Sequence, residues 1–219
     1  MDKKSVIVFD FDGTLADTTL LIQDSILNTL REYGHFEVNE SNLEDHFGPS
    51  EAGIIKKIVG DKVFPEAWTY FLEEYIRIQK DTIKKFPGMD DLLEKLSKRK
   101  DLLLLLVTGR SRETAEISLS YLGYESYFGK VYTGSEEGIN KNISIENALN
   151  DFGIKKENIV YIGDTLADIH TMKKACVDLL SVSYCYQDKS RISQLEKENG
   201  GNVMHSVLEL QERLEEITK

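Results

Sequence analysis

The stretch Val6-Ile7-Val8-Phe9-Asp10-Phe11-Asp12-Gly13-Thr14 decides the fold of this chain. Its first four residues are apolar, and they run directly into two carboxylates separated by one residue. A short apolar run that ends at a glycine turn is typical of a strand buried on both faces. Asp10 and Asp12 would then follow its carboxyl end, on the sheet edge where open parallel sheets bind ligands. The alternative is a strand that ends in a solvated acidic turn, because Asp-Gly pairs are common turn formers.

The composition indicates an acidic chain that is large enough for one sizeable domain or a domain with an insertion. Of its 219 residues 41% are hydrophobic, and 27 basic against 38 acidic residues give a net charge of −11. We expect no nucleic-acid partner, because such a partner needs a basic face. No apolar run is long enough to span a membrane, and the first residues lack the apolar segment of a signal peptide. We therefore expect a cytoplasmic protein, monomeric or homodimeric, without a membrane partner.

Residues 18–84 have a helical rather than a strand pattern. Apolar residues recur at helical spacing, and the turn formers suggest three helices that end before Gly34, Gly48 and Gly60, followed by a fourth that starts near Pro65. Ser41 and Glu44 form a possible capping box for the second of these helices. The pattern predicts an all-helical segment, residues 17–85, inserted directly after the first strand.

Beyond residue 86 the pattern alternates between strands and helices. Further strands are predicted at residues 102–107, 131–133, 159–162 and 179–182, and helices at residues 89–96, 111–122, 144–152, 168–175, 189–198 and 206–217. Such alternation implies right-handed crossovers and a parallel sheet covered on both faces. The predicted fold class is therefore α/β, with a Rossmann-like core (residues 1–16 and 86–219) and an all-helical cap domain (residues 17–85).

Polar residues follow the ends of several predicted strands. They are Asp10, Asp12, Thr108, Gly109, Arg110, Asp164 and Asp168, with Lys141 between the third strand and the next helix. Because parallel strands end on the same edge of a sheet, these groups should converge. Four carboxylates cluster only with compensating cations. Lys141 and Mg²⁺, which binds one or two carboxylates together with substrate phosphates, supply that charge, so the pattern predicts a phosphoryl-transfer site.

A resemblance to a known family rests on four motifs. They are Asp10-Phe11-Asp12-Gly13-Thr14, Thr108, Lys141 and Gly163-Asp164-Thr165-Leu166-Ala167-Asp168. Together they resemble the motifs of the haloacid dehalogenase-like superfamily, in the branch of phosphoglycolate phosphatases and related pyrophosphatases, which carries a helical cap. The resemblance covers essentially the whole chain. One departure is Lys141-Asn142, where members often have Lys-Pro. Lys130 is the competing lysine, but it leads into a strand whereas Lys141 precedes a helix.

The resemblance implies a role for each motif residue. Asp10 resembles the nucleophile that forms an aspartyl-phosphate, and Asp12 resembles the general acid/base. Thr108 and the backbone N–H of Gly109 would bind a phosphate oxygen, while Lys141 would offset the charge of the phosphoryl group.

The resemblance also implies a Mg²⁺ site. Asp10, the backbone carbonyl of Asp12 and Asp164 look like its ligands, and Asp168 would bind through water or support the site. Asp168 is alternatively the N-cap of its helix. We leave Arg110 out of the site, because an arginine in this position is more often a solvated or supporting cation.

The turn Gly48-Pro49-Ser50-Glu51 is a candidate substrate-binding element. It opens a helix of the cap, so free backbone N–H groups there could face an anion. The resemblance places a substrate-specificity loop in this region, which makes Ser50 and Glu51 candidate substrate-binding residues. The simpler interpretation is a helix start with Ser50 as its N-cap.

The predicted function is Mg²⁺-dependent hydrolysis of a small phosphate monoester, as in phosphoglycolate phosphatases. A phosphomutase of the β-phosphoglucomutase type is the first alternative, although its characteristic cap histidine is missing from residues 18–24. An inorganic pyrophosphatase of the same family is another. A dehalogenase would not need Asp12. A phospho-acceptor receiver would lack the large helical insertion, and its lysine would follow the last acidic motif.

Overall fold

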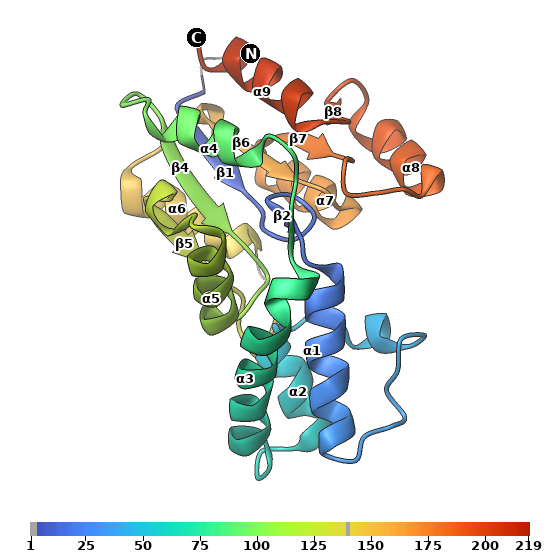
Figure 1. Ribbon diagram of the computed structural model, residues 1–219. Helices are drawn as coiled ribbons and strands as arrows, with labels where there is room; N and C mark the ends of the chain where they lie inside the picture. The colour runs from blue at the N-terminus through green and yellow to red at the C-terminus, as the bar shows by residue number, and fades with distance from the viewer. Residues whose placement is uncertain (1–3, 139–140) are drawn as a thin grey trace.

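A parallel six-stranded sheet is the centre of the computed structural model, which describes residues 4–138 and 141–219 (Figure 1). Its strand order is β5-β4-β1-β6-β7-β8. The strands are β1 (Val6–Phe9), β4 (Leu103–Val107), β5 (Lys130–Tyr132), β6 (Ile159–Gly163), β7 (Asp178–Val182) and β8 (Val203–Met204). All of them pair in parallel, so the predicted α/β class with a Rossmann-like sheet is confirmed.

Strand β1 lies in the middle of the sheet because its four apolar residues can be buried on both faces. Phe9, its last residue, is opposite Leu106 of β4 and Ile162 of β6. The next residue, Asp10, donates its backbone N–H to the carbonyl oxygen of Ile162 over 2.8 Å. The first carboxylate of the chain therefore stands at the carboxyl edge of the sheet, between two neighbouring strands.

Helices cover both faces of the sheet. They are α4 (Met89–Ser97), α5 (Arg112–Leu122), α6 (Lys141–Phe152), α7 (Leu166–Ala175), α8 (Lys189–Asn199) and α9 (Val207–Ile217). Alternate residues of β1 point to opposite sides: Ile7 and Phe9 join one hydrophobic cluster with α4, α5 and α9, whereas Val6 and Val8 join another with α6, α7 and α8. The strand period of two residues explains this division.

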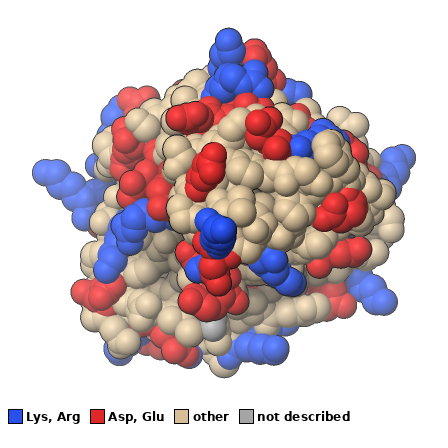
Figure 2. Space-filling view, turned by 90° about the horizontal axis from the view of Figure 1, so that it is seen from below, with Lys and Arg blue, Asp and Glu red and all other residues tan. Residues whose placement is uncertain are grey.

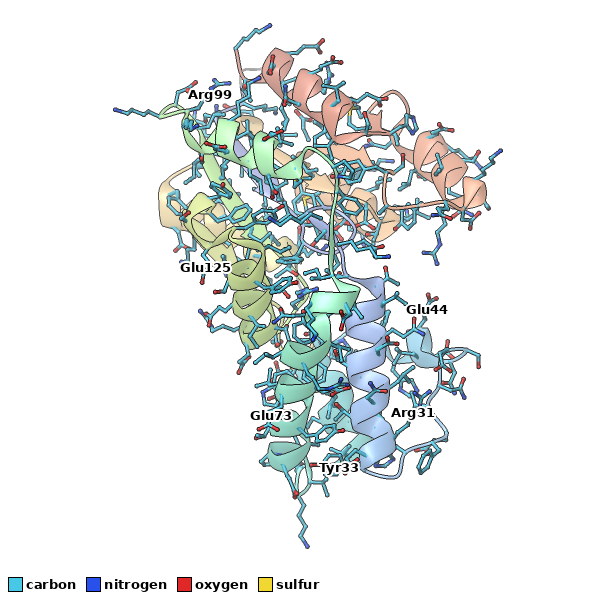
Figure 3. The ribbon with its side chains drawn as sticks, in the orientation of Figure 1. Arg31, Tyr33, Glu44, Glu73, Arg99 and Glu125 are labelled. Carbon is cyan, nitrogen blue, oxygen red and sulfur yellow. The ribbon has the colours of Figure 1, made fainter. Side chains whose placement is uncertain are left out.

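Three further helices pack together below the carboxyl edge of the sheet (Figure 1). They are α1 (Thr19–Glu32), α2 (Glu51–Val59) and α3 (Phe64–Thr82), with a 3₁₀ helix, η1 (Leu43–His46), between the first two. Figure 3 labels Arg31 and Tyr33 at the end of this bundle that is farthest from the sheet, and Glu73 on α3. Figure 2 shows the molecule from below, and acidic and basic side chains are interspersed over the surface seen in that view.

A short antiparallel ladder joins the bundle to the sheet. Strand β2 (Ala16–Asp17) carries the chain out, and β3 (Lys84–Lys85) pairs with it on the return. The division into a core of residues 1–16 and 86–219 and a cap of residues 17–85 stays a prediction, which this ladder supports. Within residues 4–138 and 141–219, no helix has both the length and the apolar character that a membrane crossing requires.

Some local predictions are wrong. Ser41 and Glu44 form no capping box, because η1 begins at Leu43 after Asn42 and has no side-chain cap. Helix α7 begins two residues earlier than predicted, so Asp168 is not its N-cap. Lys141 is the first residue of α6 rather than a residue before it. Strands β2, β3 and β8 were not predicted, since two residues are too few to show a period.

Candidate active site

Asp10 is held rigidly at the end of β1. Its side chain is buried, with Oδ1 accepting the backbone N–H of Phe11 at 2.7 Å. The other oxygen, Oδ2, lies 2.6 Å from the Nζ of Lys141 at the start of α6. Burial raises the pKa of Asp10 well above its ordinary value, and the neighbouring lysine counteracts this increase. The Asp10 carboxylate therefore has a fixed orientation and one cation beside it.

Lys141 connects Asp10 to a second carboxylate. Its Nζ also lies 2.7 Å from Oδ1 of Asp168, and its side chain is largely buried. The competing lysine, Lys130, instead pairs with Asp151 at the surface over 2.6 Å. The structure thus brings Lys141, and not Lys130, to the end of β1.

Asp168 is saturated with hydrogen-bond donors. Thr165 is the N-cap of α7, and its hydroxyl accepts the backbone N–H of Asp168 while Asp168 accepts the backbone N–H of Thr165, in a capping box. The hydroxyl of Thr165 also donates to Oδ2 of Asp168 at 2.5 Å. Oδ1 accepts from Lys141 and from the hydroxyl of Tyr161. This geometry favours a supporting role for Asp168 over direct metal ligation.

Asp164, by contrast, has an unused ligand atom. Its Oδ2 accepts the hydroxyl of Tyr186 at 2.6 Å, but its buried Oδ1 has no hydrogen-bond partner among the described residues. Ligand oxygens of Asp10, Asp164 and Asp168 all lie within 4.8 Å of one another. Burial raises the pKa of Asp164 to about 7. A buried carboxylate oxygen without a donor, in a cluster of oxygen ligands, is a good fit to Mg²⁺.

Gly13 makes room for Asp164. Its φ is +69°, a conformation that residues with a Cβ rarely adopt. A Cβ at this position would lie 2.7 Å from Cγ of Asp164, much closer than van der Waals contact. The glycine of the first motif is therefore required by both its conformation and the approach of the last motif.

The carboxylate of Asp12 turns away from this cluster. Both of its oxygens accept from Arg110, with Nε at 3.0 Å and 3.1 Å and Nη2 at 2.6 Å, and Oδ1 also accepts the hydroxyl of Thr18. Although burial alone would raise the pKa of Asp12, its pair with Arg110 lowers it. The structure thus brings three carboxylates close together, those of Asp10, Asp164 and Asp168, instead of the four expected.

Arg110, which the sequence interpretation left out of the site as a solvated or supporting cation, is a buried partner of Asp12. Only 2% of its surface is exposed, and its Nη1 donates to Ser118 of α5 at 2.8 Å and to the hydroxyl of Tyr75. The guanidinium also lies over the ring of Phe11, 4.2 Å from the centroid. A single arginine after a strand gives no sign of such burial. The one available signal was its position directly after Thr108-Gly109.

Thr108 and Gly109 lie at the end of β4, beside β1. Thr108 is buried, donates its backbone N–H to the carbonyl of Tyr132 at 2.9 Å, and accepts the backbone N–H of Arg110 on its hydroxyl at 3.3 Å. Gly109 is partly exposed. The structure therefore places this pair next to Asp10 on the same sheet edge.

Ser50 and Glu51 begin α2 and contact the core. The backbone N–H of Ser50 donates to the carbonyl of Ser135 at 3.0 Å, so the expectation that it is free for an anion is wrong. The buried carboxylate of Glu51 accepts the backbone N–H of Ser111 at 2.8 Å and the hydroxyl of Thr114 at 3.0 Å. Burial raises the pKa of Glu51. In this structure Glu51 connects the cap to the first turn of α5.

Comparison with known proteins supports the family resemblance. The family model of haloacid dehalogenase-like hydrolases matches residues 7–182. A pyrophosphatase PpaX from Oceanobacillus iheyensis is 30% identical over 184 residues, which are 83% of this chain and 85% of that protein. A phosphoglycolate phosphatase from Aquifex aeolicus is 30% identical over 172 residues, which are 78% of this chain and 80% of that protein.

Solved structures show the same fold. A haloacid dehalogenase-like hydrolase from Streptococcus pneumoniae superposes with a TM-score of 0.72 at 23% identity, covering 96% of this chain and 98% of that chain. CbbY from Rhodobacter sphaeroides, solved with phosphate, gives a TM-score of 0.73 at 18% identity, covering 93% of this chain and 94% of that chain. The family model, the two relatives and the fold agree. The chain belongs to the haloacid dehalogenase-like hydrolase family.

Proposed function

We propose that this protein is a Mg²⁺-dependent phosphatase that hydrolyses a small phosphate monoester through an aspartyl-phosphate on Asp10. The observation that carries the proposal is the arrangement at the end of β1. There Asp10 is buried, oriented by Phe11, paired with Lys141, and close to the Asp164 oxygen that has no hydrogen-bond partner among residues 4–138 and 141–219. A covalent nucleophile of this type divides one difficult displacement into two easier ones.

The residues supply both halves of such a reaction. A carboxylate oxygen of Asp10 would attack phosphorus, and the bond from phosphorus to the leaving oxygen would break. Because Arg110 favours the ionised form of Asp12, Asp12 would first take up the proton of a monoprotonated phosphate ester and then pass it to the leaving oxygen. Water would then attack the phosphorus of the aspartyl-phosphate and give its proton to Asp12, which releases inorganic phosphate and restores Asp10. Lys141, with Thr108 and the N–H of Gly109, would offset the charge on the phosphoryl oxygens.

The donor set at the sheet edge supports a Mg²⁺ requirement. Asp10, Asp164 and the carbonyl of Asp12 would hold the ion, and Asp168 would support them through Lys141. Bound there, Mg²⁺ would neutralise charge on the phosphoryl group.

The substrate is proposed to be a small phosphate compound. The relatives named above are a pyrophosphatase and a phosphoglycolate phosphatase, so pyrophosphate and phosphoglycolate are the first compounds to test. Ser50 and Glu51, at the start of α2, stay the proposed specificity residues of the cap. A cytoplasmic location and a monomeric or homodimeric state stay predictions.

The test is a panel of substrates with Mg²⁺: phosphoglycolate, pyrophosphate, several sugar phosphates, β-glucose 1-phosphate, a 2-haloacid and an aryl phosphate. Release of phosphate from one or more esters, lost in Asp10→Asn, would support the phosphatase. Conversion of glucose 1-phosphate to glucose 6-phosphate would favour the mutase instead, and halide release the dehalogenase. A folded protein that turns over nothing on the panel but accepts a phosphoryl group would favour a receiver-like switch.

A further inference from the structure

The carboxylate of Asp12 is held by one guanidinium group. Nε of Arg110 lies within hydrogen-bond distance of both carboxylate oxygens, and Nη2 lies 2.6 Å from Oδ1. Such a planar fork fixes the plane of a carboxylate as well as its position, which a lysine ammonium cannot do. The side chain of Asp12 is 35% exposed, whereas that of Arg110 is 1% exposed. The buried partner therefore orients the more accessible one.

The opposite side of the guanidinium is held by the cap. Nη1 of Arg110 donates to the hydroxyl of Tyr75, which belongs to α3, and to Ser118 of α5. The hydroxyls of Tyr75 and Ser118 are themselves 2.7 Å apart, and both residues are fully buried. One arginine thus joins a helix of the cap, a helix of the core and Asp12.

Thr18 makes a second connection between the cap and Asp12. It precedes α1 directly after β2, where the chain leaves the sheet, and its hydroxyl donates to Oδ1 of Asp12. Tyr75 lies on the last helix of the cap before the chain returns. The orientation of Asp12 therefore depends on two segments, one near each end of the inserted helices.

We propose that Arg110 is a positioning residue that orients Asp12 for proton transfer, and that Tyr75 makes this orientation depend on a seated cap. The inference rests on the proposed function, in which Asp12 protonates the leaving oxygen. Arg110 does not act on the phosphoryl group itself, because its side chain is buried and four of its five N–H groups bind Asp12, Tyr75 and Ser118. Small misplacements of a reacting group lower rates strongly, so loss of the fork should weaken acid catalysis selectively.

The test compares leaving groups. Methyl phosphate needs protonation of its leaving oxygen, whereas 2,4-dinitrophenyl phosphate does not, and kcat/KM reports the steps up to departure of that group. Arg110→Lys keeps the charge but loses the fork, so kcat/KM should fall about 10–100-fold on methyl phosphate, part of what general acid catalysis supplies. On the dinitrophenyl ester, whose leaving oxygen needs no proton, kcat/KM of Arg110→Lys should fall by less than about threefold. Tyr75→Phe should show the same selectivity with a smaller loss.

Matched controls separate positioning from general damage. Arg99→Lys removes a guanidinium fork that binds Asp101 and Thr218, far from the sheet edge, and Tyr124→Phe removes a buried hydroxyl that binds Asp90. Both should retain the wild-type ratio of the two substrates. Equal losses on both esters in Arg110→Lys and Tyr75→Phe would overturn the proposal. If Arg110→Lys does not fold, as judged by its melting curve, Tyr75→Phe decides alone.

One measurement distinguishes failure of the proposed phosphatase function from failure of the proposed role of Arg110. Wild-type turnover of the dinitrophenyl ester, and its loss in Asp10→Asn, are measured first. If the wild type does not hydrolyse this ester, the proposed phosphatase function is contradicted, and so is the role of Arg110 that depends on it. If the wild type hydrolyses the ester and Asp10→Asn does not, the proposed role of Arg110 is decided by the values of kcat/KM of Arg110→Lys and Tyr75→Phe on the two esters.

Discussion

The Nζ of Lys141, at the start of α6, lies 2.6 Å from Oδ2 of Asp10, at the end of β1. Burial by itself would lower the pKa of Lys141, but Asp10 and Asp168 raise it well above the ordinary value, so the lysine stays charged. Charges in such a buried site act more strongly than at the surface. The pair therefore places a permanent cation where the proposed reaction brings a phosphoryl group.

Replacement of Lys141 by methionine should lower turnover of an aryl phosphate by at least about 10²-fold, since one preorganised charge contributes roughly that much. Lys130→Met is the matched control, because Lys130 pairs with Asp151 at the surface. Steady-state kinetics on both variants would check this. Equal activity of the two variants would remove Lys141 from the site.

Removal of the metal should abolish activity, and Mg²⁺ should restore it. Ca²⁺ should inhibit, because its larger and looser coordination misplaces the nucleophile. Mg²⁺ should also raise the melting temperature of the wild-type protein, since a ligand that binds only the folded state stabilises it. Asp164→Asn should lose this shift in a thermal melt. Full activity in excess chelator would contradict the metal site.

The two aspartates of the first motif should behave differently when changed to asparagine. Asp10→Asn should abolish turnover and phosphoenzyme formation, because it removes the nucleophile. Asp12→Asn should slow both proton transfers, by about 10²–10⁴-fold overall. Quench experiments with an activated aryl phosphate distinguish these outcomes. Equal turnover of that ester by both variants would contradict the division of roles.

Gly13→Ala should abolish Mg²⁺ binding in addition to lowering the stability of the protein. The left-handed conformation costs a residue with a Cβ about 1–2 kcal/mol, and the new atom would also collide with Asp164. Gly153→Ala is the control, because its φ is +61° but no atom of the part of the chain that the structure describes lies within 4 Å of the added carbon. Gly13→Ala should lose more stability in urea unfolding than Gly153→Ala, because only Gly13→Ala adds the collision to the conformational cost. Only Gly13→Ala should lose Mg²⁺ binding, and retention of binding would show that Asp164 can move aside.

Glu51 should make stability depend on pH. Because burial raises its folded pKa, the folded protein binds this proton more tightly than the unfolded chain does. Its contribution to stability is therefore full below the ordinary value of 4.5 and is lost as pH rises through the folded pKa. Relative to Glu51→Gln, which does not titrate, the free energy of unfolding of the wild type should fall with rising pH.

Urea unfolding at several pH values measures this difference. Glu73→Gln, the same change at an exposed residue of α3, is the control for the substitution itself and should alter the free energy of unfolding at a fixed pH by no more than about 0.5 kcal/mol. Glu51→Ala should cost about 1–3 kcal/mol, because it leaves the buried N–H of Ser111 without its partner. A difference between wild type and Glu51→Gln that rises with pH would contradict the raised pKa.

The sheet could be predicted because its main strands show their character within a few neighbouring residues. Strand β1 is an uninterrupted apolar run, and the carboxyl ends of parallel strands must share an edge. The same reasoning brought Lys141 and Asp164 to Asp10 without knowledge of the structure. Strand β8, with only two residues, shows no such pattern.

The surroundings of Asp12 could not be predicted, because they depend on how the inserted helices sit on the sheet. The burial of Arg110, in the turn between β4 and α5, requires Tyr75, which is 35 residues away in α3. Likewise, the carboxylate of Glu51 meets Ser111 only after α2 and α5 are packed together. Periodicity identifies each helix and its apolar face, but it does not give the contact between two helices from different parts of the chain.

Because β1 lies between β4 and β6 in the sheet, its hydrogen bonds cannot all form until both of those strands are present. This strand precedes both of its neighbours in the chain, which begin at residues 103 and 159. Contacts of such long sequence separation slow folding, and both edges of β1 can pair with other chains until they are filled. A nascent chain that ends before β6 therefore carries an apolar strand with an open edge. Until β4 and β6 are made, protection of β1 from aggregation has to come from chaperones or from the ribosome, not from the fold itself.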